Sequence, residues 1–202
     1  TRKRIVHKAE RKLDVFKDII ENHYQMRGNL KYTLIYVPEG NKPDYIEGND
    51  DFDRSEDISD DSDTEHLINQ YTQVVTEVDD HVTVRKFVSG QKDREEILAD
   101  VPRSELAIFC SSTGNPRQFI QRRGRVLRTH PDKKIAELHD LVVVPELNPN
   151  SDSFRMEQSL LRGELIRVNN FALLSENPSY SEMELREVMN HYGLNLYNNK
   201  HL

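Results

Sequence analysis

Two short apolar runs constrain the fold most. Residues 32–37 form a continuous apolar and β-branched run bounded by Gly28 and Pro38, and residues 105–110 form a second run. Uninterrupted apolar runs of this length are typical of strands that are buried on both faces of a parallel sheet. Parallel strands need long crossover connections, which helices usually supply. The sequence therefore predicts an α/β fold, a parallel sheet with helices on both faces.

Helical periodicity predicts the crossovers and a C-terminal extension. The expected helices span residues 2–26, 64–78, 92–99, 116–128, 154–174 and 181–191. Gly28 and Gly193 are expected to end two of them, and Ser181 with Glu184 is expected to form a capping box. Further strands are expected at 82–88 and 136–144. We expect one domain at 1–147 and helices covering it, or packing on a neighbouring domain, at 148–202.

Charge is distributed very unevenly along the chain. The chain has 28 basic and 35 acidic residues, but eleven of the acids and one base, Arg54, lie within residues 44–65, so the remainder carries +3. A stretch with dense like charge and few apolar residues is expected to be a surface insertion at about 41–64. It either has no role or acts electrostatically, by repelling an anionic partner from one face or by shielding a basic cleft. It lacks the glycine and the distal glutamate of a calcium loop, so no metal is expected there.

Other signals narrow the class of protein. No apolar run approaches the length of a membrane span and no signal-peptide pattern begins the chain, so a cytoplasmic location is expected. The single cysteine, Cys110, ends an apolar run and is expected to be a buried small hydrophobe rather than a reactive thiol. The histidines show no metal-binding spacing, so no metal ligands are assigned.

A basic block follows the second apolar run. Asn115 is a good N-cap and Pro116 suits the first helical position, so a helix is expected to begin at Pro116. One polar face of this helix should carry Gln121, Arg125 and Arg128, and the packing face should carry Pro116, Ile120 and Leu127. Guanidinium groups bind phosphate oxygens in pairs, so an anionic partner is expected. The block holds seven basic residues against the single acid Asp132: Arg117, Arg122, Arg123, Arg125, Arg128, Lys133 and Lys134.

The order of residues in this block carries a resemblance. Residues 121–128 resemble motif VI of superfamily 2 helicases, Q-R-x-G-R-x-x-R, and residues 111–118 resemble the lead-in to that motif in the DNA repair helicase and type I–III restriction-enzyme motor branch. Residues 34–38 resemble motif IV. The resemblance implies the second of two RecA-like lobes, whose motif VI arginines reach ATP held by the first lobe.

The resemblance also implies roles for individual residues. Arg125 and Arg128 would contact the phosphates as catalytic groups, and Arg123 is the variable position of the motif. ATP and Mg²⁺ would be held mainly by the N-terminal RecA-like lobe, which would be a partner within the same protein, and DNA would be bound through its backbone without sequence preference. The remaining assignments are nucleotide contacts or bridges for Gln121, Arg122 and Gly124, and nucleic-acid contacts for Ser111, Ser112, Thr113 and Arg117.

Two departures limit this resemblance. The chain contains neither a phosphate loop of the G-x-x-x-x-G-K-[ST] type nor a D-E-x-[HD] box, so alone it should be catalytically inactive. The strand and loop of motif V are also missing, because Asp100 and the tail of that motif directly follow Ala99. A helix entering a strand with no turn is awkward, so we expect residues of the molecule to be missing near 99–101. The alternative function is a non-catalytic DNA-binding or assembly module.

Overall fold

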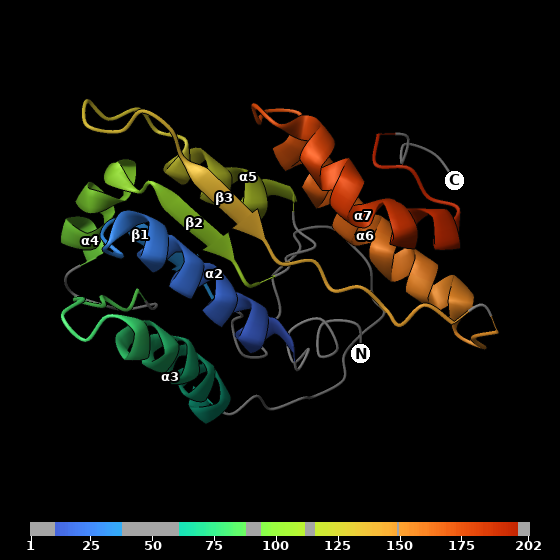
Figure 1. Cartoon of the computed structure of the whole chain (residues 1–202), viewed down its shortest axis with the longest axis horizontal. Helices are drawn as coiled ribbons and strands as arrows, with labels where there is room; N and C mark the ends of the chain where they lie inside the picture. Colours follow the sequence, from blue (N-terminus) through green and yellow to red (C-terminus); the bar gives the residue numbers. More distant parts are fainter. Residues whose placement is uncertain (1–10, 38–60, 88–93, 112–115, 149, 198–202) are drawn as a thin grey trace, which may run out of the picture. The chain divides into compact units, whose positions relative to one another are not determined.

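The computed structural model describes residues 11–37, 61–87, 94–111, 116–148 and 150–197 (Figure 1). These residues fall into two compact units, 11–141 and 142–197. Each unit has its own cluster of buried apolar side chains. The domain boundary expected at 147/148 stays a prediction. The acidic insertion expected at about 41–64 lies outside the described residues as far as residue 60, and residues 61–64 belong to a helix.

A parallel sheet forms the centre of the first unit. Its strands are β1 (Thr33–Tyr36), β2 (Leu106–Phe109) and β3 (Glu137–Asp140), in the order β1-β2-β3. Thr33 lies opposite Leu106, which in turn lies opposite Glu137. All four residues of β2 are buried, whereas the outer strands are mostly half-buried. The predicted α/β fold with a parallel sheet is therefore confirmed.

Helices cover both faces of this sheet. Side chains at alternate positions of β2 point to opposite faces. Leu106, Ile108 and Cys110 pack with α2 (Arg11–Arg27) and α3 (Asp61–Val78), where the Phe16 and Tyr71 rings meet edge to face at 4.9 Å. Phe109 faces the other way and stacks on Tyr36, on the side that α5 (Pro116–Val126) covers.

Glycines end two helices as predicted. Gly28 has φ 70° and its N–H donates to the Tyr24 carbonyl after α2, and Gly193 has φ 59° after α7 (Pro178–Tyr192). Both lie in the left-handed region that glycine adopts without strain. The predicted capping box at Ser181 is wrong, because α7 begins earlier, at Pro178. Proline is favoured in a first helical turn, and this sets the earlier start.

The strand predicted at 82–88 is wrong over its described part, 82–87. Val84 and Phe87 remain exposed there, so the segment has no buried apolar face to hold it in a sheet. Its basic side chains instead reach neighbouring helices. The Arg85 guanidinium lies 3.1 Å from Glu96 of α4 (Arg94–Asp100), and Lys86 donates to Asn69 of α3. Apolar alternation alone therefore does not make this segment a strand.

A tight turn joins α4 to β2. Residues Val101–Arg103 form a single 3₁₀ turn, η1, closed by a 3.0 Å bond from the Ser104 N–H to the Val101 carbonyl. The expectation that the helix enters the strand with no turn is wrong, because Pro102 supports this turn at its start. The absence of residues near 99–101 stays a prediction.

The second unit is a pair of helices with its own core. It contains α6 (Phe154–Ala172) and α7, which pack through residues from both helices and from the segment after α7. None of the described helices combines the length and the apolar character needed to cross a membrane. The fully or nearly fully buried members of this core are Leu161, Leu165, Val168, Ala172, Val188, Met189, Tyr192 and Leu196.

Candidate functional site

The helix α5 carries most of the candidate site, but it ends at Val126 and not at Arg128 as expected, and its buried face differs from the predicted one. Phe119 is 3% exposed and Val126 is fully buried, whereas Ile120 and Leu127 are 44% and 45% exposed. The prediction that Ile120 and Leu127 face the core is wrong. Phe119 offers more apolar area than Ile120, so burial of its ring sets the rotation of the helix. Residue 122 then lies on the same side, toward the sheet.

Arg122 is held at the carboxyl end of the sheet. Its Nη1 donates to the Ser111 hydroxyl at 2.8 Å, and its guanidinium carbon lies 5.3 Å from the centre of the Tyr36 ring. This distance is within the range of a cation–π contact. The Tyr36 hydroxyl donates to the Arg122 backbone carbonyl at 3.2 Å. The side chain and the backbone of Arg122 are therefore both bound within the same unit.

Tyr36 is placed firmly at the end of β1. Its ring stacks on Phe109 with a centroid distance of 4.7 Å and an interplanar angle of 18°. Its carbonyl accepts the N–H groups of Cys110 and Ser111 at 2.9 and 3.1 Å. Burial raises the pKa of the Tyr36 phenol, while the nearby charges of Arg125 and Arg122 act in the opposite direction. The phenol is therefore a neutral hydrogen-bond donor at neutral pH.

The remaining predicted contacts lie on α5 and just beyond its end at Val126. Arg125 is half-buried, and Arg128 and Gln121 are exposed. Within the part of the chain that the structure describes, none of these three side chains makes a hydrogen bond or an ion pair. Gly124 is exposed, and a Cβ added there would meet no atom within 4 Å. Arg122 is therefore bound by other groups of the unit, whereas Gln121, Arg125 and Arg128 make no such bond within the described residues.

The other predicted site residues divide into two groups. Ser111 is only 5% exposed, and its hydroxyl accepts from Arg122, so its predicted contact with nucleic acid stays a prediction. Ser112 and Thr113 lie outside the described residues. Arg117 lies in the first turn of α5, and its side chain also lies outside the described part.

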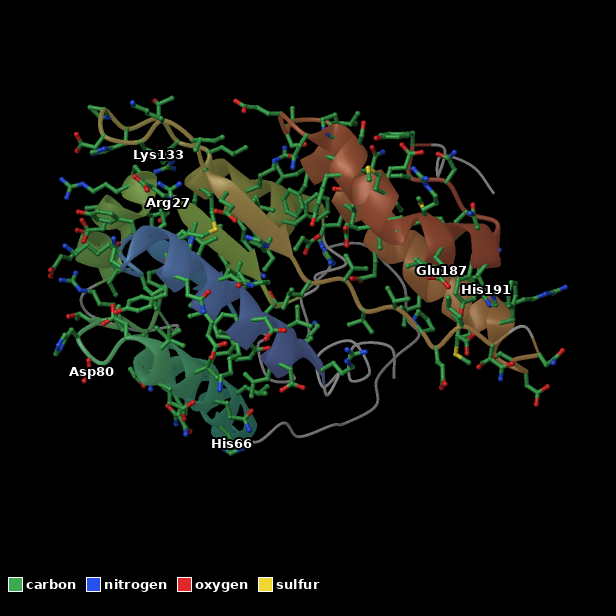
Figure 2. The ribbon with its side chains drawn as sticks, viewed as in Figure 1. Arg27, His66, Asp80, Lys133, Glu187 and His191 are labelled. Atoms are coloured by element: carbon green, nitrogen blue, oxygen red, sulfur yellow. The ribbon has the colours of Figure 1, made fainter. Side chains whose placement is uncertain are left out.

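Two residues for which no individual role was predicted also position α5. Tyr36 is one of them, and its place at the carboxyl end of a predicted parallel strand is a signal that could have found it. The other is Lys133, labelled in Figure 2, whose Nζ donates to the Val126 carbonyl at 2.7 Å. Burial lowers the pKa of Lys133. No local pattern in the sequence indicates this bond, which closes the carboxyl end of the helix.

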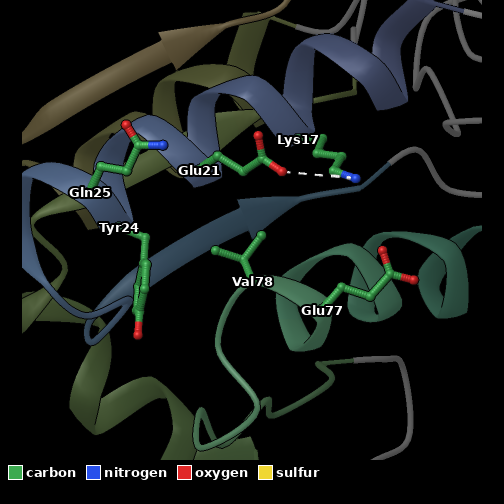
Figure 3. A pocket seen from close by; sticks show the side chains of 6 residues that line it. All are labelled: Lys17, Glu21, Tyr24, Gln25, Glu77 and Val78. Atoms are coloured by element: carbon green, nitrogen blue, oxygen red, sulfur yellow. Dashed lines mark ion pairs between the residues drawn. The ribbon is translucent and has the colours of Figure 1, made fainter.

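A shallow groove lies between α2 and α3 (Figure 3). Lys17, Glu21, Tyr24 and Glu77 are among the residues that line it, and Lys17 lies 3.8 Å from Glu21. None of the predicted site residues lines this groove. Across the described ranges, no group of three or more histidine, cysteine or acidic side chains is arranged to hold a metal ion.

No family model, curated protein or solved structure shows a significant match to this chain.

Proposed function

We propose that this chain is the second, RecA-like motor lobe of an ATP-dependent DNA helicase or translocase. In this proposal α5 supplies Arg125, and the residues directly after α5 supply Arg128, to ATP and Mg²⁺ held by an N-terminal lobe. The proposal rests on the resemblance of residues 121–128 to motif VI. The parallel sheet supports it too, because ligands of open α/β sheets gather at the carboxyl ends of the strands, where α5 begins.

The observation that carries the proposal is the different environment of three arginines, two on α5 and one just beyond its end. Arg122 is bound to Ser111 and Tyr36, so it fastens the helix. Arg125 and Arg128 have no side-chain partner within the described residues. Two guanidinium groups at the end of a fixed helix, whose donors find no acceptor among the described residues, are suited to bind the oxygens of a phosphate group.

The chemistry asked of Arg125 and Arg128 is electrostatic. Transfer of the γ-phosphoryl group to water spreads negative charge over its equatorial oxygens. An arginine placed there stabilises this charge, and such arginines accelerate hydrolysis by roughly a thousandfold or more. The other lobe would bind the nucleotide and the metal, so this chain alone should not hydrolyse ATP. Closing and opening of the cleft between the lobes would move the protein along the DNA backbone.

An Arg128→Ala change in the full-length protein tests this function. Hydrolysis of ATP should fall by roughly a thousandfold because the transition-state charge loses its partner, while DNA binding is retained. Lys134→Ala is the matched control, since it removes one exposed positive charge from the same basic block. The control should hydrolyse ATP normally.

The same pair of variants distinguishes the motor lobe from the alternative function. A non-catalytic DNA-binding or assembly module would lose DNA affinity in the Arg128→Ala variant and show no ATP hydrolysis dependent on that residue. Loss of a phosphate contact would then reduce the magnitude of the slope of log affinity against log salt concentration by about one. A phosphate-loop motif in the sequence upstream of this chain would favour the motor.

A further inference from the structure

We propose that Tyr36 is a positioning residue that sets the rotation of α5 through Arg122, with Ser111 as the second anchor. This inference rests on the proposed function in one respect, namely that the rotation of α5 determines where Arg125 and Arg128 point. The contacts that hold α5 all lie within this chain. They can be measured without nucleotide, DNA or another lobe.

Three contacts hold Arg122, and Tyr36 makes two of them. The hydroxyl of Tyr36 binds the backbone carbonyl of residue 122, the ring lies against its guanidinium group, and that group also binds the Ser111 hydroxyl. The first contact fixes the helix axis near its middle. The other two prevent rotation, because rolling the helix would carry the guanidinium away from both partners at once.

Tyr36 can hold the helix because it is itself held. It is the last residue of β1, stacks on Phe109 of β2, and accepts two backbone N–H groups from the segment that follows β2. The strand, the segment leading toward α5 and the helix therefore meet at one residue, Tyr36. Apolar burial of Phe119 and Val126 favours the same orientation, but it is not directional and permits small rotations.

The consequence falls on Arg125 and Arg128. Arg125 lies three residues after Arg122 on α5 and turns with it, whereas Arg128 follows the last helical residue, Val126, by two positions and is carried by the end of the helix. A misplacement of about 1 Å in a group that acts on a transition state can reduce the rate by roughly a hundredfold. Small rotations of α5 should therefore affect the rate of hydrolysis more than the binding of ATP.

The first measurement follows the Arg122 side chain in this chain by ¹⁵N NMR of its Nε–H group. Tyr36→Phe keeps the ring and should preserve the ring-current shift of this signal, whereas Tyr36→Leu should move it to the position of an exposed arginine. Ser111→Ala should broaden the signal, and it provides a second reading if Tyr36→Leu does not fold. An unchanged Arg122 signal in Tyr36→Leu, or in Ser111→Ala when Tyr36→Leu is unfolded, would overturn the proposal.

The second measurement is ATP hydrolysis by the full-length protein. Tyr36→Phe loses the bond to the Arg122 carbonyl and should lower kcat about tenfold with the KM for ATP unchanged. Tyr32→Phe, the same change at an exposed hydroxyl just before β1, should leave both constants unchanged. An unchanged kcat in Tyr36→Phe, in a protein whose hydrolysis does depend on Arg128, contradicts the link to α5. Hydrolysis that is independent of Arg128 contradicts the proposed function instead, and the NMR result still decides whether Tyr36 holds the helix.

Discussion

Cys110 is chemically shielded at the end of the central strand. Its side chain is fully buried, its thiol is in hydrogen-bond contact with the Tyr71 hydroxyl, and its carbonyl accepts from the buried Lys12 ammonium at 2.8 Å. Burial raises the pKa of the Cys110 thiol to about 12, although the Lys12 charge and the Tyr71 hydroxyl partly oppose this. The thiolate, which is the reactive form, is therefore scarcely populated in the folded protein.

We predict that Cys110 does not react with a thiol reagent at pH 8 until the protein unfolds. Because the pKa is raised on folding, the stabilisation is complete below the unfolded pKa of about 8.5 and is lost as the pH rises toward about 12. Denaturation curves from pH 7 to 11 would measure this loss, and Cys110→Ala should reduce it. Rapid modification of the folded protein at pH 8 would contradict the prediction.

Single residues also show where sequence reasoning succeeds and where it fails. Burial of Cys110 followed from its place in an apolar run, and the structure confirms it. The rotation of α5 did not follow, because Phe119 and Ile120 are adjacent apolar residues and periodicity alone does not decide which one is buried. The bond between Tyr36 and Arg122 joins residues 86 positions apart, so no local pattern contains it.

Among the elements, the start of α6 is organised by one carboxylate. Glu157 accepts the Ser153 hydroxyl at 2.6 Å and the Ser151 hydroxyl at 2.8 Å, and its second oxygen accepts the Tyr192 hydroxyl from α7 at 3.0 Å. The bond from Ser153, followed by that from Ser151, lowers the pKa of Glu157. The ionised carboxylate therefore links the beginning of α6 to the end of α7.

We predict that acid weakens the pairing of α6 with α7. The pKa of Glu157 is depressed on folding, so its contribution is present above the ordinary glutamate pKa of about 4.3 and is lost as the pH falls through the lower folded value. Glu157→Gln should be less stable at pH 7 and should lose less stability on acidification. Thermal unfolding at pH 7 and pH 3 gives the comparison. Equal acid sensitivity in both proteins would contradict it.

Helices and strands were predicted correctly where the burial of one or both faces determines the secondary structure. The strands at β1 and β2 were predicted because their residues are apolar on both faces, and the helices followed from periodicity and glycine stops. The strand at 82–88 was predicted from the same kind of composition. It failed because pairing also needs a neighbouring edge and a core to cover Val84 and Phe87, which are properties of the tertiary structure.

At the scale of the whole molecule, the order and parallel direction of the strands place α5 at the carboxyl end of the sheet. The parallel direction was predictable, since buried apolar strands separated by helices favour it. The two units, each with its own core, divide at Leu141/Val142. The sequence placed the boundary a few residues later, at 147/148, from the composition of the linker alone. At the junction of α4 with η1 the sequence departs from the helicase family that it resembles, because the strand and loop of motif V are missing there.

Peptide mapping tests that junction. Cleavage after Arg94 and Arg103 yields one peptide, residues 95–103, if Asp100 is bonded directly to Val101. We predict that mass spectrometry will not find this peptide and will find longer ones that carry a further strand and loop, because motif V is otherwise incomplete. The peptide spanning residues 104–117 serves as the control for digestion and recovery. Detection of the intact peptide 95–103 would show that the chain is continuous there.

The hydrogen bond from Tyr36 ends on the main chain of residue 122, and this limits what mutagenesis of the arginines can reveal. Alanine at position 122 would remove a guanidinium group but leave the carbonyl in place. The Tyr36 hydroxyl at the end of β1 would therefore still bind the helix. A survey that replaces each arginine of α5 in turn would therefore understate how strongly the helix depends on its support. That dependence becomes visible only when the donor on the strand is changed.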